Sequence, residues 1–140
     1  EAKAVEKAAA IAVELGAKRA VPLAVSAPFH CSLMAPAAEK LKAELEKVEV
    51  HEMKVPVVAN VNAEIVPSAE YVKESLYKQV SSPVLWEDSV RTMIGNGVDT
   101  FVEIGPGKVL SGFIKKIDRN VRTLNVEDIA SLENTLHELA

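Results

Sequence analysis

The sequence predicts an α/β protein with a mostly parallel sheet. Short apolar strands alternate with amphipathic helices along the 140 residues, and this order of elements is the one that builds parallel sheets. Hydrophobic residues make up 49% of the chain and charged residues 26%, a composition typical of folded globular proteins. A chain of this length corresponds to one average domain, and we expect it to bury a sizeable core.

The first half of the chain is expected to form three helices and two strands. In order, they are a helix at 1–15, a strand at 19–25, a helix at 36–48, a strand at 55–61 and a helix at 69–80. Gly16 suits the end of the first helix, Pro36 suits the first turn of the second, and Ser68 can cap the third. No capping residue precedes the first helix, as expected of a chain cut from a larger protein; a frayed natural terminus is the alternative.

The second half continues the alternation of helices and strands. The pattern predicts a helix at 84–94, a strand at 100–104, a helix with apolar residues at 109–114, a strand at 121–124 and a final helix with an apolar stripe at 129–139. Gly105-Pro106-Gly107 turns the chain from the strand into the next helix, and Asn125 is expected to cap the last helix.

Charge and composition exclude several classes of partner. The net charge of −4 and the low aromatic content of 4% argue against nucleic acid and against an anionic membrane. No apolar run reaches the roughly 18 residues of a membrane-spanning helix, and we find no signal peptide. A single cysteine, Cys31, allows no internal disulfide and fits a reducing compartment. We therefore predict a cytoplasmic protein.

The segment Ser26-Ala-Pro-Phe-His30 is the first candidate for chemistry. It follows a predicted strand, and a proline-stiffened turn there would present the imidazole of His30 at a strand end. Imidazole exchanges a proton near neutral pH without special tuning, which suits a general base. The alternative is a histidine that is satisfied in the core or idle on a loop. No serine in the chain stands in a Gly-x-Ser-x-Gly motif, so no nucleophile accompanies it.

Three further motifs follow His30 in order. They are the Asn-rich loop Ala59-Asn-Val-Asn-Ala63, the segment Gln79-Val-Ser-Ser-Pro-Val-Leu-Trp86, and the segment Glu103-Ile-Gly-Pro-Gly-Lys-Val-Leu110. Together with the histidine motif, their order and spacing resemble the malonyl-CoA:acyl carrier protein transacylases, the acyltransferases that load malonyl groups for fatty-acid synthesis. The resemblance extends from about Ala17 to the end of the chain.

The resemblance implies roles for four residues. His30 would be the catalytic base, and the backbone carbonyl of Gln79 would accept a hydrogen bond from its other ring nitrogen, in the place of a triad aspartate. Phe29 and Asn60 would bind substrate, and the ring of Phe29 would narrow the acyl pocket against an α-methyl group. The substrates implied are malonyl-CoA and the phosphopantetheine thiol of acyl carrier protein. Neither a metal nor another cofactor is implied.

The resemblance also implies a fold and a missing part. Residues 1–25 would end a ferredoxin-like small subdomain, and residues 26–140 would belong to a hydrolase-like α/β/α sandwich. The family's serine nucleophile and its carboxylate-binding arginine lie upstream of the matching region, so we expect this chain to be the C-terminal half, with the missing N-terminal half as its partner. A non-catalytic module that binds a carrier protein or a partner subunit is the alternative, and an excised polyketide synthase domain is a lesser one.

Other candidate sites carry weaker signals. Gly105 and Lys108 stand too close together for the spacing of a phosphate-binding loop, so a structural turn is the expected role. Cys31 adjoins His30, but neighbours in an extended chain point to opposite faces, which favours a packing role. His51 and His137 have no partners at metal-ligand spacing. We therefore predict no metal site.

Overall fold

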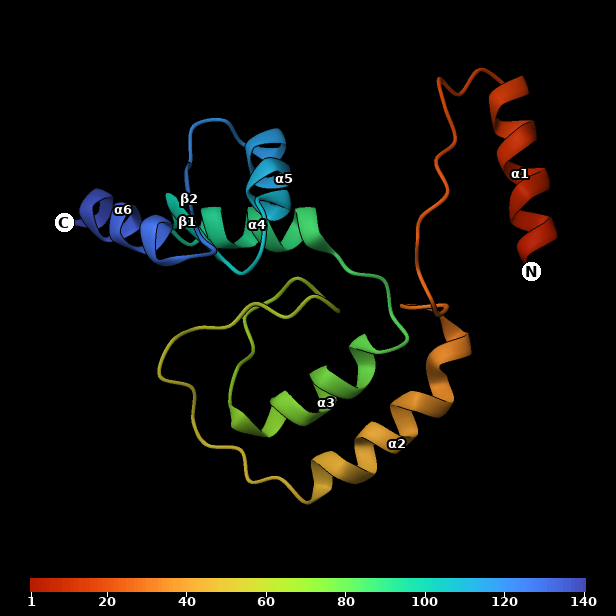
Figure 1. Ribbon diagram of the computed structural model, residues 1–140. Coiled ribbons are helices and arrows are strands. Elements are labelled where there is room, and N and C mark those ends of the chain that lie inside the picture. Colours follow the sequence, from red (N-terminus) through yellow and green to blue (C-terminus); the bar gives the residue numbers. More distant parts are fainter.

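The computed structural model describes residues 1–140 as six α-helices joined by extended segments, with a small sheet near the carboxyl terminus (Figure 1). In order, the elements are α1 (Ala2–Glu14), a single 3₁₀ turn (Ser32–Met34), α2 (Ala35–Glu46), α3 (Ala69–Gln79), α4 (Trp86–Gly95), β1 (Thr100–Ile104), α5 (Val109–Ile117), β2 (Arg122–Val126) and α6 (Ile129–Leu139). All six predicted helices are confirmed, as are the last two predicted strands. No helix is both long enough and apolar enough to cross a membrane.

The carboxyl-terminal part forms a β–α–β unit. Strands β1 and β2 pair in parallel, with Val102 opposite Leu124, and α5 connects them. The best-buried cluster joins Val90 of α4, Ile114 of α5 and Val121 just before β2, with Phe101 of β1 packed against it. The protein is therefore a mixed α/β structure, mostly helical, with a two-stranded parallel sheet. A wider α/β/α sandwich stays a prediction.

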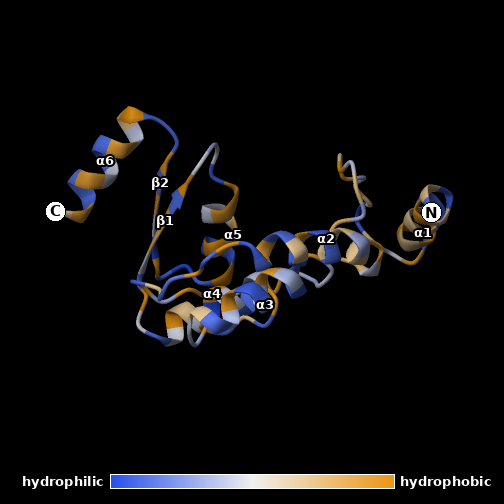
Figure 2. Ribbon diagram, turned by 90° about the horizontal axis from the view of Figure 1, so that it is seen from below, coloured by the Kyte–Doolittle hydropathy of each residue, from blue (hydrophilic) through white to orange (hydrophobic).

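The hydrophobic core is much smaller than the length of the chain led us to expect. Only eight residues are buried, and large apolar side chains lie exposed on most elements. Figure 2 shows hydrophobic residues on α1 and α6, at the two ends of the chain. Figure 1 shows α1 standing apart from the other helices, and none of its residues is buried. The expectation of a sizeable core was wrong for this chain, because many of its apolar faces have no partner.

One face of β1 is exposed. Side chains alternate between the two faces of a strand, and Phe101 points toward the core cluster below α5. Val102 and Ile104 therefore point to the other face of β1, where they are 37% and 81% exposed. Parallel sheets are normally covered on both faces. This open face of β1 therefore lacks the cover that a parallel sheet normally has.

Two predicted strands are wrong. Residues 19–25 form no strand, although their sequence is apolar, and residues 55–61 contribute only an isolated antiparallel bridge between Val58 and Ile65. A strand exists only where a neighbouring strand accepts its backbone hydrogen bonds. Neither segment has such a neighbour in this chain. The division into subdomains at residue 25 stays a prediction.

The cap of the last helix also differs from the prediction. Asn125 lies within β2, and Asp128 is the capping residue of α6. The Asp128 carboxylate accepts hydrogen bonds from the hydroxyl of Ser131 at 2.6 Å and from its amide at 2.8 Å. These two bonds lower the pKa of Asp128 below its ordinary value of 3.8. Ser68 does stand at the N-cap of α3, but its side chain makes no capping bond.

The cap predicts a pH dependence of stability. Because the folded-state pKa of Asp128 is lowered, its contribution is complete above its ordinary value and disappears as the pH falls through the lowered value. The free energy of unfolding in urea should therefore drop on Asp128→Ala near neutral pH, and the difference from the parent chain should shrink in acid. Glu133→Ala, which removes an exposed carboxylate from α6, is the control; an equal pH-dependent loss there would contradict the assignment.

Candidate active site

His30 occupies a constrained turn between the extended segment after α1 and the 3₁₀ turn before α2. Its φ angle of 60° lies in the left-handed region, which is uncommon for residues with a Cβ. The amide of Phe29 donates to the carbonyl of Ala27 at 2.9 Å, which tightens the chain just before the histidine. The turn therefore holds His30 in a backbone conformation that is unfavourable for a residue with a Cβ. Such strained conformations are often found at functional sites.

The imidazole of His30 contacts the far end of α3. Its Nδ1 atom lies 3.2 Å from the carbonyl oxygen of Gln79 and 3.1 Å from that of Ser82. Carbonyl oxygens only accept hydrogen bonds, so Nδ1 carries the ring proton and donates to both. The lone pair of the neutral ring then lies on Nε2. This geometry includes the carbonyl contact that the resemblance implies, and the catalytic roles of His30 and Gln79 stay predictions.

One of these acceptors lies at a helix end, because Gln79 is the last residue of α3. The last carbonyl groups of a helix lack intrahelical donors. The Gln79 carbonyl is therefore available to accept the hydrogen bond from His30 Nδ1. Ser82 is not among the residues predicted for the site; the helix break at Ser81-Ser82-Pro83 is the sequence signal for free carbonyls there.

Asn60 and Gln79 line one apolar cavity of about 370 Å³ beside α3. The remaining walls are mostly aliphatic and come from the segment 50–66 and the inner face of α3, namely Val50, Met53, Val57, Val58, Ala59, Val66, Val72, Ser75 and Leu76. The carbonyl of Asn60 accepts a hydrogen bond from the amide of Leu85 at 3.0 Å. His30, Gln79 and Asn60 are thus brought into one neighbourhood.

Phe29 lies on the same turn as His30 but does not line the cavity. Its side chain is 54% exposed, and no wall of this chain encloses it. The substrate-binding roles of Phe29 and Asn60 stay predictions. A closed acyl pocket around Phe29 would need additional protein.

The turn after β1 is held by the chain's own carboxylates. The amide of Gly107 donates to Glu127 at 3.0 Å, and the amides of Leu110 and Ser111 donate to Glu103 at 3.1 and 2.7 Å. The nearby Ser111 hydroxyl and the amide of the same residue lower the pKa of Glu103. A phosphate-binding loop would offer such amides to a ligand. Here internal carboxylates take them, which supports the structural reading of this turn.

The structure also describes the surroundings of Cys31 and of the residues that could bind a metal. The thiol of Cys31 donates to the carbonyl of Pro28 at 3.1 Å, not to His30, so it helps to close the turn. No group of three or more His, Cys, Asp or Glu side chains is placed to hold a metal ion.

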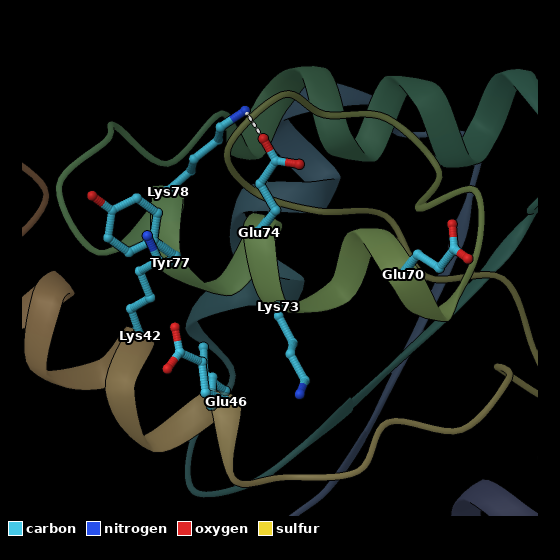
Figure 3. Close-up of a pocket in the computed structure, with 8 residues that line it drawn as sticks. Lys42, Glu46, Glu70, Lys73, Glu74, Tyr77 and Lys78 are labelled. Atoms are coloured by element: carbon cyan, nitrogen blue, oxygen red, sulfur yellow. Dashed lines mark ion pairs between the residues drawn. The ribbon is translucent and has the colours of Figure 1, made fainter.

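A groove of about 440 Å³ lies along the contact between α2 and α3 (Figure 3). The hydroxyl of Tyr77 on α3 donates to Glu39 on α2 at 2.6 Å, and the ammonium of Lys42 lies 5.5 Å from the Tyr77 ring centre. The hydrogen bond to Glu39 and its negative charge raise the pKa of Tyr77. Since α2 follows the His30 turn and α3 presents the acceptor carbonyls, this contact helps to align the two sides of the site.

Comparison with known proteins places the chain in a family. No family model matches it. It is 49% identical over 138 residues to the malonyl CoA-acyl carrier protein transacylase of Bacillus subtilis, a match that covers 99% of this chain and 44% of that protein. The chain belongs to the malonyl CoA-acyl carrier protein transacylase family. It spans less than half the length of the family members that it matches.

Solved structures of the family agree with this fold. The transacylase of Clostridium perfringens superposes with a TM-score of 0.88 at 51% identity, over 97% of this chain and 43% of that one. A malonyl-transacylase in complex with a type II PKS acyl-carrier protein superposes with a TM-score of 0.90 at 44% identity, over 97% of this chain and 44% of that one. The backbone of the chain therefore has the arrangement of the matching part of these longer proteins.

The link between α2 and α3 predicts a shifted titration. In a Tyr71→Phe background, absorbance near 295 nm should follow Tyr77 alone and show ionisation above the ordinary pKa of 10.0, because the Glu39 contact raises it. Glu39→Gln should move the midpoint back toward the ordinary value. The contact stabilises the fold below pH 10 and is lost as the pH rises through the raised value. Equal midpoints in the two proteins would contradict the contact.

Proposed function

We propose that this chain supplies the base half of a malonyl-transfer site. The reaction moves a malonyl group from coenzyme A to the phosphopantetheine thiol of acyl carrier protein through a seryl ester. The observation that carries the proposal is the double hydrogen bond from His30 Nδ1 to the end of α3, which leaves Nε2 free to accept a proton. The serine comes from the part of the family that this chain does not match, because no Gly-x-Ser-x-Gly motif is present here.

The proposed chemistry assigns one proton to His30 at each step. Nε2 takes the proton of the serine hydroxyl as its oxygen attacks the malonyl thioester carbon, and it then gives that proton to the departing coenzyme A sulfur. The carrier's thiol attacks the ester in the second half, with His30 again taking and returning one proton. A positioned base of this kind contributes about 10²–10⁴-fold in rate. The carbonyls of Gln79 and Ser82 orient the ring.

Phe29 and Asn60 are proposed to contact the acyl group and the pantetheine arm. Phe29 stands one residue before the base and is exposed, so its ring is free to form a wall once the rest of the site is present. A wall there would discriminate against an added α-methyl group by about 1–3 kcal/mol. Asn60 lines the same cavity as Gln79, which supports a role for it in the same region.

Fold and location follow from the same proposal. Residues 1–25 would complete a ferredoxin-like subdomain and residues 26–140 a hydrolase-like α/β/α sandwich in the cytoplasm. Acyl carrier protein is the proposed partner; a family structure is described as a complex of such a carrier with its malonyl-transacylase. The missing N-terminal half is the second proposed partner, and it would extend the sheet past β1 and cover Val102 and Ile104.

Reconstitution tests the assignment of His30. The chain should be mixed with the unmatched part of the Bacillus subtilis relative, and transfer from malonyl-CoA to phosphopantetheinylated carrier protein should be measured. We expect transfer only from the combined parts, and His30→Ala should lower it by about 10²–10⁴-fold. His137→Ala, which removes an exposed histidine on α6, is the matched control.

Two results would overturn this proposal. One is efficient malonyl transfer by the 140-residue chain alone, since it lacks the serine. The other is near-normal transfer by the combined parts carrying His30→Ala. Tight association of the parts with no transfer under any condition would favour the alternative, a non-catalytic module that binds a carrier or a subunit.

The open face of β1 predicts where the complementary part binds. Ile104→Asp changes a side chain that is 81% exposed, so the chain alone should keep its helical content. Burial of the new carboxylate against the partner should weaken association by at least about tenfold, which corresponds to ~1.4 kcal/mol. Asn134→Asp, which adds the same charge at an exposed polar position of α6, is the control. Equal dissociation constants for the two variants by calorimetry would contradict binding at β1.

A further inference from the structure

We infer that Ser82 and Pro83 are positioning residues for His30. Neither side chain forms a hydrogen bond with the imidazole, whose partners are backbone carbonyls. They act by leaving two backbone carbonyls free at the end of α3 and by aiming both at one ring nitrogen. The catalytic consequence of this inference rests on the proposed function, but the structural consequence does not.

Pro83 removes the donor that would otherwise satisfy Gln79. In an α-helix the carbonyl of one residue accepts from the amide four residues later, and the residue four positions after Gln79 is Pro83. Proline has no amide hydrogen, so continuation of α3 cannot occupy the Gln79 carbonyl. Proline also disfavours a helical conformation at Ser82. The helix accordingly ends at Gln79, and His30 Nδ1 takes the vacant position at 3.2 Å.

Ser82 folds the chain back over the helix end. Its hydroxyl donates to the carbonyl of Lys78 at 2.8 Å, in place of the amide that the next helical turn would have supplied. This bond fixes residue 82 above the last turn of α3. Its own carbonyl then lies 3.1 Å from His30 Nδ1, beside the carbonyl of Gln79.

The pair of acceptors has a measurable effect on the ring. The tautomer of a neutral histidine is set by the hydrogen bond that its other nitrogen makes. Two carbonyls on Nδ1 hold the proton there and keep Nε2 as the acceptor. Loss of either restraint should let the Nε2–H tautomer gain population, and Nε2 would then be unable to accept a proton.

Long-range ¹H–¹⁵N correlation spectra of the ¹⁵N-labelled 140-residue chain test this directly. At a pH where the ring is neutral, His30, assigned by its loss in His30→Gln, should show the Nδ1–H pattern. Ser82→Ala and Pro83→Ala should each shift the ¹⁵N frequencies toward the Nε2–H form. Ser81→Ala is the matched control, because the Ser81 hydroxyl takes no part in this contact. Ser82→Thr, which keeps a hydroxyl, should preserve the parent pattern.

The outcomes separate this inference from the proposed function. Parent-like nitrogen frequencies in both Ser82→Ala and Pro83→Ala would overturn it, as would loss of the Nδ1–H pattern in Ser82→Thr. Far-UV circular dichroism identifies any variant that fails to fold, and the threonine variant then decides. In the reconstituted enzyme, Ser82→Ala should lower kcat by about tenfold with KM unchanged, less than loss of the base itself. The spectra keep their meaning even if His30→Ala proves fully active.

Discussion

The hydrogen bonds from His30 Nδ1 to the end of α3 are the constraint on which the site depends. They join a turn near residue 30 to carbonyls about fifty positions later in the chain, so every element between them must place those ends together. The packing of α2 against α3 does this, and the Tyr77–Glu39 bond crosses the same interface. Neutral carbonyls orient the ring as a carboxylate would, although they stabilise its positive charge less than a carboxylate does.

The small core agrees with the share of its relatives that the chain spans. A parallel pair of strands needs cover on both faces, and a two-stranded sheet is marginal by itself. Here α5 covers one face, while Val102 and Ile104 stay exposed on the other. The comparisons agree, because the chain spans less than half of the relatives that it matches while it follows their fold closely. The exposed surface is thus expected of a chain that spans less than half of those relatives.

Local patterns predicted what depends on local interactions. The helices followed from apolar spacing, and β1 was predicted with the bounds that it has. The strands expected at 19–25 and 55–61 failed because a strand depends on a neighbour that the sequence of this chain does not supply. The cap predicted at Asn125 was wrong because β2 continues to Val126 and moves the start of the helix to the residues after Asp128. The Gln79 contact came from family resemblance, and the Ser82 contact needed the three-dimensional path of the chain after the helix.

The left-handed backbone at His30 has a consequence for engineering the site. Glycine adopts a φ of 60° without the steric cost that a Cβ brings, so it is the substitution that removes the ring and keeps the shape of the turn. The space vacated would still face two fixed carbonyls. Free imidazole from the buffer could donate one nitrogen to them and offer the other to the reaction. The same geometry that strains the histidine thus makes the position suited to chemical rescue by a small diffusible base.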